Sequence, residues 1–180
     1  MPGNQKDGRQ VVPTGTATFL PYDLEGPVQP EMSWLPISYD EAGGCGTYAM
    51  RMDPGAVLPA HNHPNASVCT LGFEGEVRLR NFEIIGEAPD YASKKTFRVR
   101  ETRNEVMSHG RINTLSPLRD NVHCFQVGEE GARGIDINTL HGKTNDFRFL
   151  DISKTPADSE KRIFEAAWSD LGRPAPGKKP

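Results

Sequence analysis

The chain has 180 residues, a net charge of −3 at pH 7 and 36% hydrophobic residues, which suits one compact domain with a real core. Lys, Arg, Asp and Glu are mixed along the chain, so it offers no broad basic surface for phosphate groups and nucleic acid is not expected as a partner. The 18 glycines and 15 prolines, against 8% aromatic residues, favour an all-β fold of short strands and tight turns.

Two alternating segments are expected early in the chain. Residues 14–20 suggest an edge strand, and residues 46–52 alternate clearly, which puts Tyr48, Met50 and Met52 on one face. That face is either ordinary barrel core or, in a sharper interpretation, the wall of a pocket to which Tyr48 contributes a hydroxyl group. Tyr48 is therefore a candidate site residue.

Further strands are expected in the middle of the chain. Residues 54–64 begin with a turn signal and then alternate, residues 75–85 and 96–102 alternate on either side of a loop, and residues 120–127 read as another strand. So many short strands punctuated by turns predict a small barrel.

The end of the chain is expected to contain a closing strand over residues 146–151 and an amphipathic helix over residues 158–171. The helix is predicted because apolar residues recur at helical spacing, Asp158 can cap the start and Gly172 can end it. The domain organisation predicted is a flexible segment over residues 1–13, a single domain over 14–171 and a disordered tail over 172–180.

Compartment is inferred from the cysteines and the N-terminus. The three cysteines form an odd set without paired spacing, which indicates a reducing, cytoplasmic environment. Cys69 and Cys124 lie in apolar strand patterns and are interpreted as packing thiols rather than nucleophiles. Residues 1–13 are polar and resemble neither a secretory signal nor a membrane span, so no membrane association is expected.

His61 and His63 carry the main functional signal. A strand places side chains at i and i+2 on one face, so both imidazoles point the same way, and His123 lies on a later predicted strand. These three residues are the predicted metal ligands. The alternative is that His61 and His63 are solvated histidines at a strand end.

The punctuation around these histidines resembles the cupin superfamily, a double-stranded β-helix, over about residues 44–139. Val68 stands where a cupin usually has a glutamate ligand, which narrows the resemblance to three-histidine cupins. Residues 59–64, 73–77 and 121–125 are similar to the cysteamine dioxygenase and plant cysteine oxidase branch of the thiol dioxygenases. That branch usually has a tyrosine near the iron after its Leu-Asp-Val-like strand, and none occurs near residues 140–142.

Asp136 and His141 are the remaining candidate catalytic residues. Asp136 lies on an expected interior strand, where an unpaired carboxylate is costly, so it should bond a histidine or an arginine. A plain structural salt bridge is its alternative. His141 follows that strand, near the place of the family's missing tyrosine, and is a candidate proton donor. His109 is flanked by turn residues and should lie on a surface loop.

The resemblance implies Fe(II) as the cofactor, with zinc as the alternative, and oxidation of a small-molecule thiol by dioxygen to a sulfinic acid. Two other functions fit three histidines: cleavage of a carbon-carbon bond in a diketone or enol, and a non-catalytic zinc-binding sensor. Exposed strand edges would allow a homodimer, as cupins often form.

Overall fold

The computed structural model describes residues 32–40, 42–142 and 147–170. Every strand pair is antiparallel, and no helix occurs within these ranges, so the predicted all-β class is confirmed. The segment over residues 1–13, the edge strand predicted over 14–20 and the tail over 172–180 lie outside the described residues.

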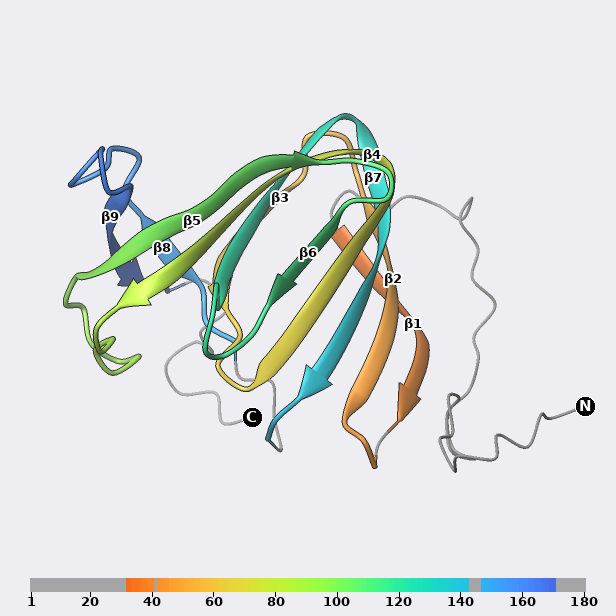
Figure 1. Cartoon of the computed structure of the whole chain (residues 1–180), viewed down its shortest axis with the longest axis horizontal. Helices are drawn as coiled ribbons and strands as arrows, with labels where there is room; N and C mark the ends of the chain where they lie inside the picture. The colour runs from red at the N-terminus through yellow and green to blue at the C-terminus, as the bar shows by residue number, and fades with distance from the viewer. Residues whose placement is uncertain (1–31, 41, 143–146, 171–180) are drawn as a thin grey trace, which may run out of the picture.

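In the described part of the chain, one sheet of nine strands forms the barrel, in the order β1-β2-β7-β4-β5-β9-β8, with β3 paired to β7 and β6 paired to β4 (Figure 1). The strands are β1 (Met32–Asp40), β2 (Cys45–Met52), β3 (Val57–Asn62), β4 (Ala66–Ile85), β5 (Phe97–Met107), β6 (Ile112–Leu115), β7 (Val122–Leu140), β8 (Leu150–Ile152) and β9 (Ile163–Trp168). Strands β1 and β2 lie at one end of the sheet in Figure 1, and β8 and β9 lie at the other.

The long strands β4 and β7 close the fold because each changes partner along its length. The C-terminal part of β7 pairs with β2, whereas its N-terminal part pairs with β3. Strand β4 pairs with β6 near its start and with β5 near its end. The two long strands also pair with each other over most of their length, which gives the double-stranded β-helix predicted from the sequence.

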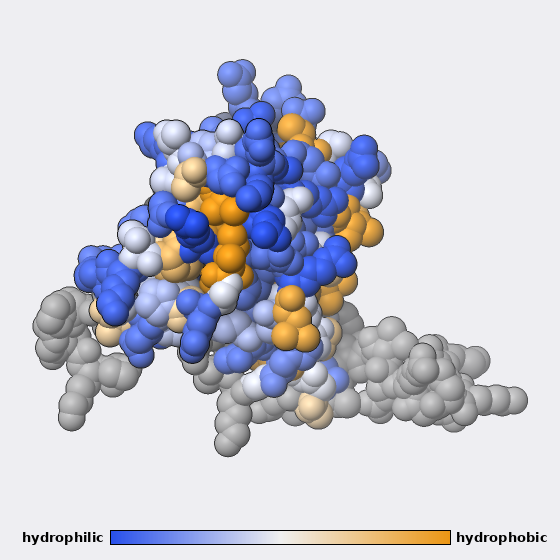
Figure 2. Space-filling view, turned by 60° about the vertical axis from the view of Figure 1, so that its left-hand side comes forward, coloured by the Kyte–Doolittle hydropathy of each residue, from blue (hydrophilic) through white to orange (hydrophobic). Residues whose placement is uncertain are grey.

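Two apolar clusters fill the interior. One lies under β5, β8 and β9 and includes Phe82, Val99 and Trp168, and the other includes Met50, Leu79 and Phe125. Burial alternates along β5, as expected for a strand with one face on the core. The face shown in Figure 2 is mostly hydrophilic, with apolar residues in small separate patches. Within the described ranges, no helix has the length and apolar character needed to cross a membrane.

The helix predicted over residues 158–171 is wrong for the described part of that range, because residues 163–168 form strand β9. The Asp158 carboxylate accepts a hydrogen bond from the Lys161 amide as a helix cap would, but Arg162 adopts a φ of 54° and reverses the chain. The following residues then alternate in burial and pair with β5 and β8. The apolar set therefore follows a period of two rather than 3.6.

Candidate metal centre

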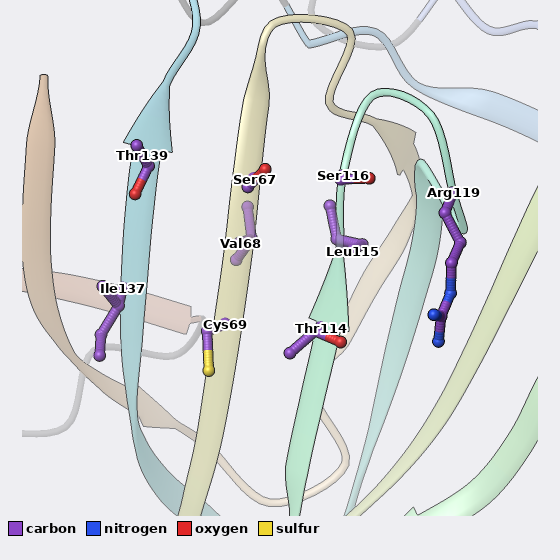
Figure 3. Close-up of a pocket in the computed structure, with 9 residues that line it drawn as sticks. All are labelled: Ser67, Val68, Cys69, Thr114, Leu115, Ser116, Arg119, Ile137 and Thr139. Carbon is purple, nitrogen blue, oxygen red and sulfur yellow. The ribbon is translucent and has the colours of Figure 1, made fainter.

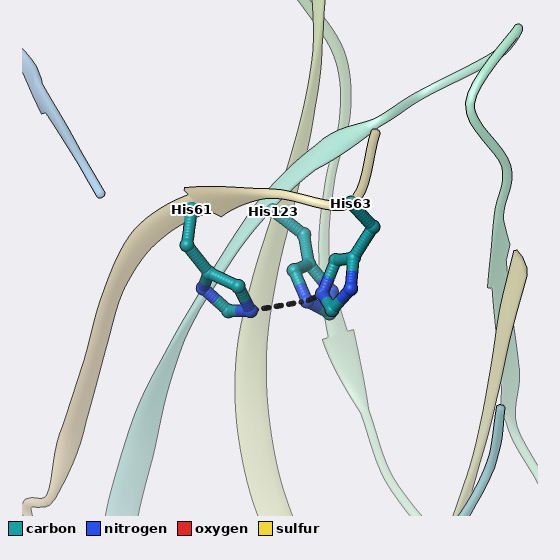
Figure 4. A group of neighbouring side chains, drawn as sticks. All are labelled: His61, His63 and His123. Atoms are coloured by element: carbon teal, nitrogen blue, oxygen red, sulfur yellow. Dashed lines mark hydrogen bonds between the residues drawn. The ribbon is translucent and has the colours of Figure 1, made fainter. Parts of the chain in front are cut away.

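His61 lies on β3, His63 directly follows β3, and His123 lies on β7, so the three side chains meet inside the barrel (Figure 4). His61 lies opposite His123 in the ladder between these strands. The Nε2 atom of His123 is 3.0 Å from that of His61 and 3.2 Å from that of His63. All three side chains are buried, and their ligating atoms lie within 4.8 Å of one another.

A β-bulge in β3 aims His61 into the barrel. Leu58 pairs with Phe125 and His61 pairs with His123, so β3 has one more residue than β7 across this step. The extra residue makes it possible for Leu58 and His61, which would otherwise face opposite sides, to line the same cavity. Pro59 suits the bulge because it has no amide hydrogen to leave unpaired.

The bulge also fixes the tautomer of His61. Its Nδ1 is 2.9 Å from the Pro59 carbonyl oxygen, which can only accept, so Nδ1 carries the hydrogen and the lone pair lies on Nε2. Burial lowers the pKa of His61 to about 4, against a smaller opposing effect of this hydrogen bond. Burial, followed by the charges of His61 and His63, lowers the pKa of His123 well below its usual value. The neutral rings are the forms that bind metals.

The donor set fits one metal ion. Nitrogen ligands about 2.1 Å from an ion lie about 3.0 Å apart at right angles and about 3.4 Å apart at the tetrahedral angle. The two separations that involve His123, 3.0 and 3.2 Å, fall in this range, and the ligating atoms of all three histidines lie within 4.8 Å of one another. Without an ion, the Nε2–H of a neutral His123 can donate to the His61 Nε2 lone pair across the 3.0 Å contact, and a bound ion would take the place of that proton. Burial disfavours an additional proton on His61 and on His123. Among the residues that the structure describes, the cluster holds three histidines and no carboxylate, a set that suits Fe(II) or Zn²⁺.

The histidines open onto a cavity of about 380 Å³. Its walls are mostly apolar and aromatic, and its polar members besides the histidines are Asp136 and Asn138. The apolar members are Trp34, Leu58, Val68, Phe125, Phe147 and Phe149. A cavity of this size and character accommodates a small organic molecule beside the metal position.

Asp136 lines this cavity and is held by residues that the sequence analysis did not single out. Its carboxylate accepts hydrogen bonds from Trp34 Nε1 at 2.8 Å and from Thr70 Oγ1 at 2.5 Å. These donors, among the described residues, replace the histidine or arginine expected as its partner. Burial raises the pKa of Asp136, although both hydrogen bonds act in the opposite direction.

The other two predicted catalytic residues lie elsewhere. The Tyr48 ring lies against Gly46 rather than along the cavity wall: a Cβ added at Gly46 would be 2.7 Å from its hydroxyl oxygen. His141 is exposed, and its Nε2 lies 2.7 Å from the Ser67 hydroxyl. The structure therefore brings Asp136 to the three histidines but not Tyr48 or His141.

Sequence reasoning missed the aromatic wall. Phe147 and Phe149 both pack on His61 with ring centroids 5.8 Å away. Their i and i+2 spacing already placed them on one face of the strand expected over residues 146–151, but not next to a histidine. Trp34 gave no such signal, because it reaches Asp136 across 102 positions of the chain.

A second cavity, of about 330 Å³, lies around Cys69 (Figure 3). Cys69 comes from β4 and lies between Thr114 of β6 and Ile137 of β7. Burial, with a smaller contribution from the charge of Asp136, raises the pKa of the Cys69 thiol, which makes it a poor nucleophile. All three cysteines are free, as expected for a chain without a disulfide framework.

No protein-family model matches the chain, and no curated protein matches it either. Among solved structures it is similar to KdgF from Halomonas sp., with 16% identity, a TM-score of 0.45, and 63% of this chain and 84% of that chain covered. An uncharacterised conserved protein with a double-stranded β-helix domain from Klebsiella pneumoniae has 14% identity and a TM-score of 0.48, with 68% and 87% covered.

A recombinant oxalate oxidase in complex with glycolate has 16% identity and a TM-score of 0.45, with 66% of this chain covered. The chain spans 53% of the length of that oxidase. Likenesses at this level transfer no ligand and no activity to the chain.

Proposed function

We propose that His61, His63 and His123 hold Fe(II) and that the protein is a dioxygenase that converts a thiol into a sulfinic acid. The observation that carries this proposal is the convergence of three buried imidazoles on one cavity, with no carboxylate among the described residues of the cluster. Such a ligand set leaves the full charge of the ion uncompensated, which favours an anionic substrate atom such as a thiolate. The likeness of residues 59–64, 73–77 and 121–125 to the thiol dioxygenases supports the same reaction.

In the proposed reaction the thiol and one dioxygen molecule give the sulfinic acid, so both oxygen atoms end on sulfur. The ion supplies a site at which thiolate and dioxygen can meet and exchange electrons. The chain fixes the geometry: Pro59 holds the ring of His61, and the bulge keeps that ring directed inward. Asp136 faces the same cavity and orients the substrate by hydrogen bonding, while Trp34 and Thr70 hold its carboxylate in place.

The apolar walls favour a second candidate, cleavage of a carbon-carbon bond in an enolised diketone. A bidentate enolate is also an anionic ligand, and Trp34, Phe125 and Phe149 would pack against its apolar substituents.

The test begins with the metal content of freshly purified protein, followed by anaerobic loading with Fe(II). Oxygen uptake is then measured with cysteamine, cysteine, 3-mercaptopropionate, a peptide with an N-terminal cysteine, and pentane-2,4-dione. We expect thiol-dependent uptake and a product that has gained two oxygen atoms. His123→Ala should lose both metal and uptake, whereas His109→Ala, a matched change at an exposed loop, should keep both.

Uptake with the diketone alone would transfer the assignment to carbon-carbon cleavage. Zinc in the purified protein, together with iron-loaded protein that is inert to every substrate, would identify a non-catalytic zinc-binding cupin instead. A His123→Ala variant that retained iron and full turnover would refute the ligand assignment.

A further inference from the structure

Asn62 lies between two of the proposed ligands but points away from them. At the end of β3, His61 and His63 both line the cavity, whereas Asn62 between them points to the opposite side, where it is 2% exposed. Its Oδ1 accepts a hydrogen bond of 2.7 Å from the Arg148 amide, and its Nδ2 donates to the Tyr91 hydroxyl at 3.3 Å. Asn62 therefore contacts the segment that runs beside β3, not the metal position.

Residues 147–149 form main-chain interactions with the end of β3 at two neighbouring positions. The Asn62 amide donates to the Arg148 carbonyl at 3.0 Å, and His61 forms a bridge with Phe149. The Arg148 side chain lies over the Tyr91 ring, with 5.1 Å from its Cζ to the ring centroid. Since Arg148 faces Asn62 and Tyr91, the residues on either side of it face the cavity.

Phe147 and Phe149 form the aromatic wall that results. Their ring centroids are 5.5 Å apart with the planes nearly perpendicular, and both rings pack edge-on or tilted against His61. Phe147 is 43% exposed, so it stands at the boundary between the cavity and solvent. If a substrate binds at the histidines, the part of it that extends away from the metal contacts this aromatic wall.

We propose that Asn62 is a positioning residue that pins the aromatic wall, and that Phe147 and Phe149 select substrates carrying an apolar group next to the metal-binding atom. This inference rests on the proposed function for the existence of a metal-bound substrate. It deepens that function by assigning specificity to residues that do not bind the metal. Removing the Asn62 side chain should release the wall while leaving the main-chain bond from Asn62 to Arg148 in place.

The first experiment needs no metal and no turnover. Hydrogen exchange of the Arg148 amide should accelerate by about tenfold or more in Asn62→Ala, because its acceptor is lost. The Ser153 amide, which donates to the Glu165 carbonyl between β8 and β9, should be unchanged and serves as the internal control. Unchanged exchange at Arg148 would show that Asn62 does not pin the segment.

The second experiment uses protein loaded with Co(II), which reports a bound thiolate by its visible absorption. Ethanethiol and benzyl mercaptan are the probes, and wild-type protein should bind the benzyl compound about tenfold more tightly because its ring packs on the wall. Phe147→Ala and Asn62→Ala should each reduce this preference to less than about threefold. Asn62→Asp should restore it, since a carboxylate can still accept from Arg148 and from the Tyr91 hydroxyl.

The controls separate this inference from the proposed reaction. Thiolate binding to Co(II) requires no oxidation, so a protein that never oxidises a thiol can still show or lack the benzyl preference. Asn104→Ala removes an asparagine that bonds Glu101, away from the cavity lining, and should keep both the metal and the preference. An unchanged preference in Phe147→Ala would overturn the role of the wall. Loss of Co(II) from Asn62→Ala would overturn the positioning role, because Asn62 would then be supporting the ligands themselves.

Discussion

Glu101 joins three parts of the sheet, and replacing it by glutamine should destabilise the fold by about 2–3 kcal/mol. This side chain of β5 is buried and accepts hydrogen bonds from Arg80 Nε at 2.5 Å, Arg162 Nη2 at 2.8 Å and Asn104 Nδ2 at 3.1 Å. Charge-assisted hydrogen bonds contribute about 1.5–3 kcal/mol each, and breaking a fully buried ion pair costs about 3–5 kcal/mol. Because the side chains of Arg80 and Arg162 are 31% and 45% exposed, water can take over part of their solvation, which lowers the expected cost.

The pH dependence of this effect follows from the pKa of Glu101. Burial alone would raise it, but the hydrogen bonds and charges of Arg162 and Arg80 outweigh burial and lower it. The folded protein therefore binds a proton less readily than the unfolded chain, whose glutamate pKa is about 4.3. The stabilisation is fully present above that pH and is lost as pH falls through the lower folded value.

Urea unfolding of wild-type protein and Glu101→Gln at several pH values between 7 and 3 measures this difference. It should be largest at neutral pH and shrink in the acidic range. Glu165→Gln is the matched control on the same sheet: its ion pair with Arg98 at 3.1 Å is exposed, so the change should cost less than about 1 kcal/mol. Equal costs for the two variants, or a Glu101 effect that stays constant down to pH 3, would refute the reasoning.

Three further predictions concern the backbone, the core and the cavity. Gly75→Ala should cost about 2–5 kcal/mol in urea unfolding, because φ is +71° and the new Cβ would collide with the Gly131 carbonyl. Gly86→Ala is the control: its φ is +76° but a Cβ there would meet open space, so the change should cost only about 1–2 kcal/mol. Similar costs for the two variants would contradict the role of the collision. Leu79→Ala should cost about 2–5 kcal/mol, since Leu79 is fully buried, whereas Val106→Ala at an exposed position of β5 should cost less than about 1 kcal/mol; calorimetric unfolding tests both. Asp136→Asn should have a free energy of unfolding at pH 7 at least as large as that of wild type, because burial raises the carboxyl pKa and so destabilises the charged form, and because the amide can accept from Trp34 and donate to Thr70. Asp136→Ala, by contrast, should lose about 1–3 kcal/mol. An Asn variant as unstable as the Ala variant would contradict this account.

The strands that hold the histidines were predictable because their signals are local. Alternation and turn residues around His61 and His63 predicted β3, and the strand predicted over residues 120–127 corresponds to the start of β7. The bulge at Pro59 could not be read from alternation, since it interrupts the very pattern on which the prediction rests. The proximity of His123 to His61 and His63 depends on the pairing of β3 with β7, which the local sequence does not specify.

Three other features of the structure could not be predicted, because local sequence patterns do not determine them. Residues 163–168 satisfy both a helical and an alternating pattern, and pairing with β5 and β8 decides in favour of the strand. The partners of Asp136 come from distant segments, so no local pattern could identify Trp34 or Thr70. Tyr48 lies on the expected strand, yet its ring lies over Gly46, a side-chain direction that alternation does not specify.

The pairing of β3 with β7 has a consequence for how the chain folds. His61 and His123 face each other across a ladder although 62 positions separate them, whereas β1 with β2 and β4 with β5 are joined by short connections. Closing a long loop costs more entropy than closing a short hairpin, so the hairpins can form early and the β3–β7 pairing late. During synthesis, moreover, β7, which is the ladder partner of β3 among the described residues, emerges well after β3. Capture of a metal ion by all three histidines would therefore signal that the barrel has closed, and its binding free energy would be added to the folded state alone.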